Sequence, residues 1–163
     1  MDIPKIKSLI EGSEKVLELE KEGFFLSSFM YMARSLSAPP HSTIVNFYHK
    51  LRNELASFNV DESRLEFAGL SPPMKETEII PLEAGKISMT AEEAMRKCGS
   101  KAPDEAISRV VLVLRMSTNS KAENGPTWQV NIFLKNFSVV SAVFDAENGE
   151  EIASTKMSLS SKL

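Results

Sequence analysis

The sequence predicts an α+β protein in which an N-terminal helical unit precedes a helix packed on a four-stranded antiparallel sheet. Apolar residues near the N-terminus recur at helical spacing, whereas apolar and polar residues alternate from Trp128 to Ile132, as in a strand with one buried face. Asn148-Gly149, which follows a second apolar run, is typical of a tight hairpin turn. These patterns predict helices first and an antiparallel meander last.

Length and composition limit the classes of protein to consider. A chain of 163 residues with 42% apolar content can bury a core as one domain or two small ones. The net charge of -3 and the absence of a Lys/Arg block argue against nucleic acid as a partner. Cys98 is the single cysteine and cannot form an intramolecular disulfide. The apolar stretches are shorter than the roughly 20 residues that cross a bilayer, and residues 1–5 lack a signal-peptide pattern. We therefore expect a soluble cytoplasmic protein with no membrane contact.

The first unit, residues 1–60, is predicted to contain two or three helices. Residues 4–22 have helical periodicity, with a weak point at Gly12-Ser13 where a break is an open alternative. Residues 24–36 are dense in large apolar groups and predict a central bundle helix, which Pro39-Pro40 ends. Ser42 or Thr43 can cap a further helix that reaches about Phe58.

A connector is predicted over residues 61–87, because prolines interrupt the periodicity there and leave room for one short strand around residues 65–70. The second unit, residues 88–163, starts at Thr90-Ala91-Glu92-Glu93, a capping-box pattern for a short helix that Gly99 would end in a left-handed conformation. A strand follows over residues 106–117, whose buried register the continuous apolar run leaves open. After a polar loop at 117–126, strands are predicted over 127–135, 138–144 and 151–157.

This C-terminal part resembles PepSY-like domains over about residues 88–158. The likeness is carried by Thr90 to Ala94 at the helix start, by Trp128-x-Val130-x-Ile132 in the central strand, and by the ending from Val143 to Ile152. It implies a helix packed on an antiparallel sheet, similar to cystatin-like folds. It also implies a regulatory, inhibitory or ligand-contacting role without catalysis.

Reactive chemistry is sparse. His41 and His49, taken with Glu54 or Asp61, match no metal-ligand spacing, so no metal site is predicted. Cys98 near a helix C-terminus is expected to be a buried structural thiol. No serine, glycine-rich or dinucleotide motif is present, Asp145 is expected to cap a turn rather than bind a cation, and no cofactor is predicted. His49 with Arg52 and Glu54 is the one conceivable seed of a catalytic site, and we expect the protein not to be an enzyme.

A surplus of aromatic and methionine side chains points instead to binding. Its members are Phe24, Phe25, Phe29, Met30, Met32, Phe47 and Tyr48. Short helices cannot bury so many large groups alone, so these residues must dock on the sheet, form a homodimer or line an apolar pocket. We take Phe25, Phe29, Tyr48 and Trp128 as candidate contact residues, with Trp128 open between a core role and a recognition role. The predicted function is a binding or regulatory module that acts through protein contacts, including self-association; the alternative is a small apolar ligand held between helices and sheet.

Overall fold

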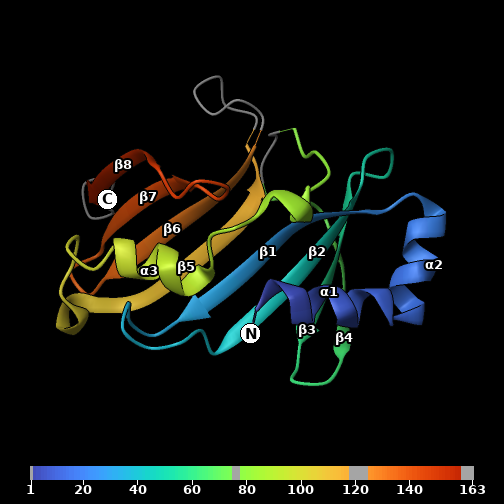
Figure 1. Cartoon of the computed structure of the whole chain (residues 1–163), viewed down its shortest axis with the longest axis horizontal. Helices are drawn as coiled ribbons and strands as arrows, with labels where there is room; N and C mark the ends of the chain where they lie inside the picture. The colour runs from blue at the N-terminus through green and yellow to red at the C-terminus, as the bar shows by residue number, and fades with distance from the viewer. Residues whose placement is uncertain (1, 75–77, 118–124, 159–163) are drawn as a thin grey trace.

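The computed structural model describes residues 2–74, 78–117 and 125–158 and shows three helices lying on one broad sheet (Figure 1). Residues 118–124 of the predicted polar loop lie outside the described residues. The helices are α1 (Ile3–Glu11), α2 (Glu14–Glu22) and α3 (Ala91–Lys97), with short 3-10 turns at η1 (Ala84–Lys86) and η2 (Asp104–Ala106). The strands are β1 (Phe25–Ala33), β2 (Ser42–His49), β3 (Glu54–Val60), β4 (Leu65–Ser71), β5 (Ile107–Met116), β6 (Pro126–Leu134), β7 (Ser138–Asp145) and β8 (Glu151–Ser158).

All eight strands belong to one antiparallel sheet, in the order β4-β3-β2-β1-β5-β6-β7-β8. The prediction of a four-stranded sheet is therefore wrong. Strands β5 to β8 match the four strands expected in the C-terminal part, but β1 continues the sheet on the far side of β5. The pairing of each outermost strand with its neighbour is interrupted by a bulge, at Ser57/Phe58 and at Val143/Phe144.

The prediction that residues 24–60 form helices is also wrong, because β1, β2 and β3 occupy this segment. Strand β1 lies in the middle of the sheet and carries apolar side chains on both faces, Phe29 and Tyr31 toward the helices and Met30 and Met32 away from them. Apolar residues therefore stand at consecutive positions and hide the two-residue period. The short strand predicted around residues 65–70 within the connector is confirmed as β4.

Helix boundaries follow the capping signals. Asp2 caps α1, Ser13 caps α2 through the Val16 amide, and the chain breaks between them at Gly12, the weak point noted in the sequence. Thr90 and Glu93 form the predicted capping box of α3. The expected left-handed end at Gly99 is wrong, since α3 ends at Cys98 in a right-handed conformation. No helix in the described ranges has the length and apolar character needed to span a bilayer.

The two halves of the chain repeat one arrangement: helix, then a four-stranded meander. Helices α1 and α2 precede β1 to β4, and α3 precedes β5 to β8. Equivalent residues are Val45 and Val130, Asn46 and Asn131, Lys50 and Lys135, Ser57 and Ser141, and Asp61 and Asp145. The turns that follow β2 and β6 contain Asn53 and Phe137, which are the non-glycine residues with positive φ in the described part of the chain.

A pseudo-twofold axis normal to the sheet relates these halves. The strand register makes Met30 of β1 equivalent to Val113 of β5, and these two residues are partners across the β1–β5 pairing. The axis therefore passes between them, at the middle of the sheet.

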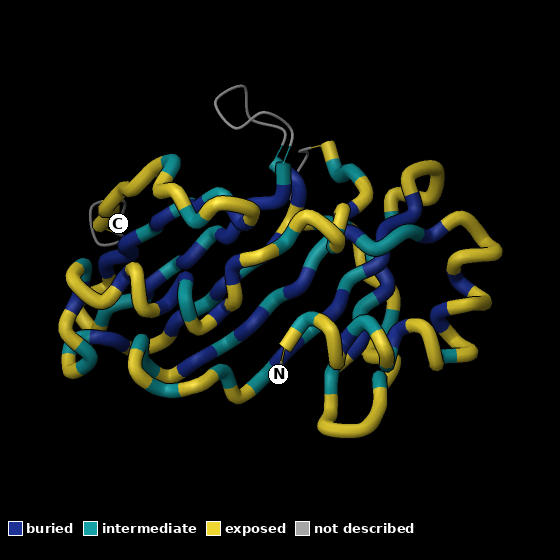
Figure 2. Tube along the Cα trace, in the orientation of Figure 1, coloured by how far each residue is buried: buried dark blue, intermediate teal, exposed yellow. Residues whose placement is uncertain are grey.

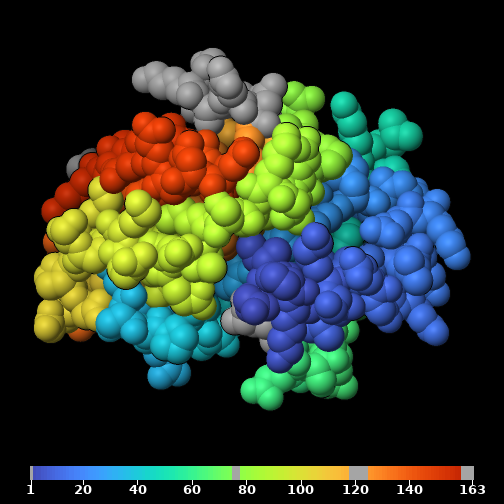
Figure 3. Space-filling view, viewed as in Figure 1, coloured from blue at the N-terminus to red at the C-terminus, as the bar shows by residue number. Residues whose placement is uncertain are grey.

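The helices cover a single face of the sheet and enclose the core against it. Figure 3 shows the helices of both halves forming the near surface of the molecule, and Figure 2 shows buried and less buried residues alternating along the strands beneath. Ile6, Val16, Ala94 and Met95 of the helices share the core cluster with the buried strand residues. In β5 the residues facing the helices are Val110, Leu112 and Leu114, which decides the register that the sequence left open.

Trp128 is anchored inside this core. Its side chain is fully buried, its ring lies 5.5 Å from that of Tyr31, and its indole Nε1–H donates to the Met89 carbonyl at 2.9 Å. The hydrogen bond ties the segment before α3 to the sheet and satisfies a polar group that burial would otherwise penalise.

Replacing Trp128 by Phe should lower the free energy of unfolding by about 2 kcal/mol, because the Met89 carbonyl loses its donor and a void is left. Equilibrium denaturation measures this loss. Leu51→Ser is the control: Leu51 is 94% exposed, and the change should stay within about 0.5 kcal/mol. Equal losses in the two variants would contradict the assigned role of Trp128.

Candidate functional site

The sheet surface opposite the helices is the candidate site, and we call it the open face. No described helix lies over it. Side chains alternate along each strand, so the residues between the core positions point to this face. Its centre is apolar, with partly exposed side chains on β2, β1 and β5: Ile44, Met30, Met32, Val111 and Val113. Gln129 of β6 separates this group from Val143 of β7.

The four candidate contact residues divide between the two faces. Phe29 and Trp128 have no exposed surface and belong to the core, where an external partner cannot reach them. Phe25 and Tyr48 pair across β1 and β2 on the open face, with ring centroids 5.7 Å apart in an edge arrangement. The Tyr48 hydroxyl donates to Asn53 Oδ1 at 2.9 Å, which fixes the ring.

Two equivalent Asn–Ser pairs flank the apolar centre. The Ser57 hydroxyl donates to Asn46 Oδ1 at 2.7 Å, and the Ser141 hydroxyl donates to Asn131 Oδ1 at 2.9 Å. Asn46 also donates through Nδ2 to the hydroxyl of Ser28 at 3.1 Å. Each pair gives the asparagine Oδ1 and the serine hydroxyl hydrogen a partner, so covering these atoms removes little hydrogen bonding to water.

Charged groups of the open face lie away from its centre. Arg109 and Arg115 stand toward the two ends of β5, where Arg109 lies 4.7 Å from the Phe133 ring centroid and Arg115 donates to Gln129 at 3.4 Å. Glu66 lies on the outer strand β4. An apolar, methionine-containing centre with arginine and aromatic groups around it is similar in composition to the contact surfaces of known protein complexes.

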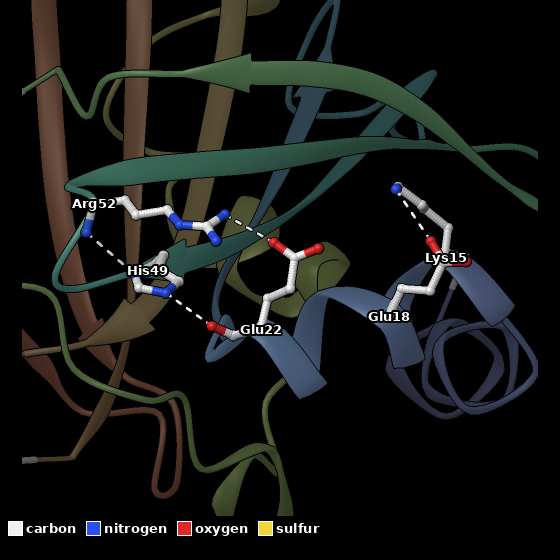
Figure 4. A network of polar contacts seen from close by, with 5 residues as sticks. All are labelled: Lys15, Glu18, Glu22, His49 and Arg52. Atoms are coloured by element: carbon white, nitrogen blue, oxygen red, sulfur yellow. Dashed lines mark hydrogen bonds and ion pairs between the residues drawn. The ribbon is translucent and has the colours of Figure 1, made fainter.

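His49 lies on the opposite face and joins α2 to the β2–β3 turn (Figure 4). Its Nδ1 accepts the Arg52 backbone N–H at 3.1 Å, so Nε2 carries the proton and donates to the Glu22 carbonyl at 2.9 Å. Phe24 packs edge-on against the ring at 5.0 Å, and a Cβ at Gly23 would come within 3.2 Å of Nε2. Both nitrogens are occupied by backbone groups, so the ring holds structure together and has no free nitrogen for proton transfer.

The other histidine lies elsewhere. His41 borders an open hollow of about 650 Å³ at the start of α1, together with Asp2, Lys5, Asp61 and Glu62. Asp2 and Asp61 are engaged as caps of local backbone amides. Within the described ranges no three His, Cys, Asp or Glu side chains are grouped to hold a metal ion. The hollow is polar and open, and it lies apart from the core cluster of buried residues that the helices and sheet share.

Cys98 and Asp145 occupy structural positions. Burial raises the pKa of the Cys98 thiol to about 11, an effect that nearby Lys101 opposes and Glu151 reinforces. The thiol is therefore protonated at neutral pH and is a poor nucleophile. Asp145 Oδ1 accepts the amides of Glu147 and Asn148, as expected for a turn cap.

Comparison with known proteins defines the fold and leaves the family open. No protein-family model matches the chain, and no curated protein matches it. A solved structure described as a "putative lipoprotein" from Clostridium difficile 630 matches with a TM-score of 0.53, covering 88% of this chain and 89% of that one at 12% identity. This likeness concerns the fold alone. The PepSY-like resemblance and the cytoplasmic location stay predictions.

Removing the His49 ring should destabilise the protein by about 2–3 kcal/mol in His49→Ala, because two part-buried backbone groups lose their partner and the buried ring leaves a void. His49→Asn keeps an acceptor near Nδ1 and His49→Gln keeps a donor near Nε2, so each should recover part of the loss in equilibrium denaturation. His41→Ala, at an exposed position, should change little. Equal stability of all four variants would exclude the joining role of His49.

The Cys98 thiol should react with an aromatic disulfide reagent at pH 8 far more slowly in the native protein than in denaturant, since it is buried and protonated. The raised pKa also predicts a stability contribution that is present below about pH 9 and lost as pH rises toward 11, because the unfolded thiol releases its proton first. Cys98→Ala should show a smaller alkaline loss. Immediate stoichiometric labelling of native protein would refute this placement.

Proposed function

We propose that this protein is a non-catalytic binding module that contacts another protein through the open face. The observation that carries this proposal is the asymmetry of the sheet: helices cover one face, and the other presents a half-buried apolar centre around Met30 and Val113. Isolated apolar residues on a surface are common, but a contiguous group on neighbouring strands is typical of an interaction site.

The arrangement of polar groups supports contact rather than catalysis. Beside the centre of the open face, amides and hydroxyls bond to each other, as in the Asn46–Ser57 and Asn131–Ser141 pairs. A catalytic site needs a nucleophile and a base placed to exchange a proton, and the described side chains of this face carry no such pair.

The PepSY-like resemblance of residues 88–158 adds a regulatory role to this proposal, because such domains act by contact. The structure supplies a matching helix and four strands in that segment, α3 and β5 to β8. The open face, however, extends across both halves. We therefore place the binding function on the whole sheet.

Site-specific photo-crosslinking in the cells that produce the protein tests this function. A photoreactive residue at Val113 or Ile44 on the open face should give discrete adducts of higher mass, whereas one at Leu51, which is 94% exposed in the β2–β3 turn, should not. The open-face adducts should disappear when Met30 is changed to Lys in the same chain. Absence of adducts at both open-face positions, or equal adducts at Leu51, would overturn the proposal.

A further inference from the structure

We propose that the protein bound by the open face is a second copy of this chain, with the two open faces packed against each other. This inference rests on the proposed function and names its partner. Two eight-stranded sheets would then form a sandwich with the helices on the outside. Face-to-face sheets of this kind pack about 10 Å apart, with side chains from both inner faces between them.

The size of the open face fits a stable dimer. Eight strands of 7 to 10 residues make up the sheet. With strands about 4.8 Å apart and a rise of about 3.4 Å per residue, the face covers roughly 900 Å². A standard specific interface buries about 800 Å² on each partner. One copy of the face therefore supplies the area that one stable contact needs.

The chemistry of the face fits a partner of the same kind. The central side chains, among them Met30, Ile44 and Val113, are apolar and uncharged, so two copies bring no like charges together at the middle. The Asn46–Ser57 and Asn131–Ser141 pairs are already hydrogen-bonded within the chain. In each pair the asparagine Oδ1 and the serine hydroxyl hydrogen have their partners, so burying these atoms against a second copy requires no group from a different protein.

The symmetry of the face makes it suitable for self-association. A twofold dimer uses the same patch on both subunits, so the patch must complement itself. The pseudo-twofold axis between Met30 and Val113 already gives each half of the face the same Asn–Ser pair beside the same apolar centre. A rotated copy therefore meets an Asn–Ser pair on either half, with Met30 and Val113 at the centre of the contact.

Sedimentation velocity of the purified full chain over a concentration series tests this proposal. The wild-type protein should be a dimer, and Met30→Lys should be a monomer, because the lysine stem keeps the shape of methionine while its ammonium group would be buried at the centre. Met30→Leu is the matched control and should remain a dimer. Circular dichroism shows that each variant is folded. A wild-type monomer at every concentration, or a folded Met30→Lys dimer, would overturn the proposal.

Val113→Thr provides an independent variant if Met30→Lys does not fold. The side chains have nearly the same shape, and a hydroxyl in the dry centre of the contact should raise the dimer dissociation constant roughly tenfold. An unchanged constant would count against the assigned face. The photo-crosslinking result separates this inference from the proposed function. If the open face crosslinks to a different protein and the wild-type chain is a monomer, the dimer alone is rejected. If the open face gives no adducts and the chain is a monomer, both proposals are rejected.

Discussion

The pairing of β1 with β5 is the constraint on which the rest of the structure depends. It joins two four-stranded meanders into one sheet. It also places four side chains in a single core, where each is at most 1% exposed: Phe29, Tyr31, Leu112 and Leu114. Each fully buried side chain of this size contributes about 1.5–3 kcal/mol, and a whole domain is stable by only about 5–15 kcal/mol. The burial energy of these four side chains is therefore comparable to the whole free energy of unfolding, so neither half is expected to be stable without the β1–β5 pairing. Because the equivalent residues Met30 and Val113 are partners in this pairing, the pseudo-twofold axis of the internal repeat passes through it.

The covering of the sheet follows from the same repeat. Each half brings its helices to one face, because a twofold axis normal to a sheet returns every element to the side from which it started. Two sets of helices then bury the central strands of one face, and Trp128 and His49 fix the segments that carry those helices through bonds to backbone carbonyls. The opposite face receives no helix from either half within the described residues. The open face is therefore a consequence of the repeat.

Much of the C-terminal half could be predicted from local pattern. The capping box at Thr90, the alternation from Trp128 to Ile132 and the turn at Asn148-Gly149 each reflect short-range physics, and α3, β6 and β8 appear where they indicate. The helix prediction for the first half failed for a physical reason. The central strand β1 has apolar residues on both faces, with Phe29 on one face and Phe25 and Met30 on the other, so its sequence does not alternate between apolar and polar residues. Of the candidate contact residues, Phe25 and Tyr48 lie on the open face, while Phe29 and Trp128 belong to the core, a distinction that requires the strand register. The repeated Val-Asn at 45–46 and 130–131, each followed by Lys four residues after Asn, was the sequence signal that could have revealed the duplicated strands.

The bulges beside the two outermost strands affect how molecules of this protein meet one another in a crowded cell. The outer edges of β4 and β8 offer backbone groups to any extended chain, and a long straight edge invites unlimited addition of copies into fibres. The shifts at Ser57/Phe58 and Val143/Phe144 break the regular spacing of the last strand on each side, and Gly69, with φ of 138°, lies at the first of these shifts. Each end of the sheet is thus a poor template for the addition of further strands.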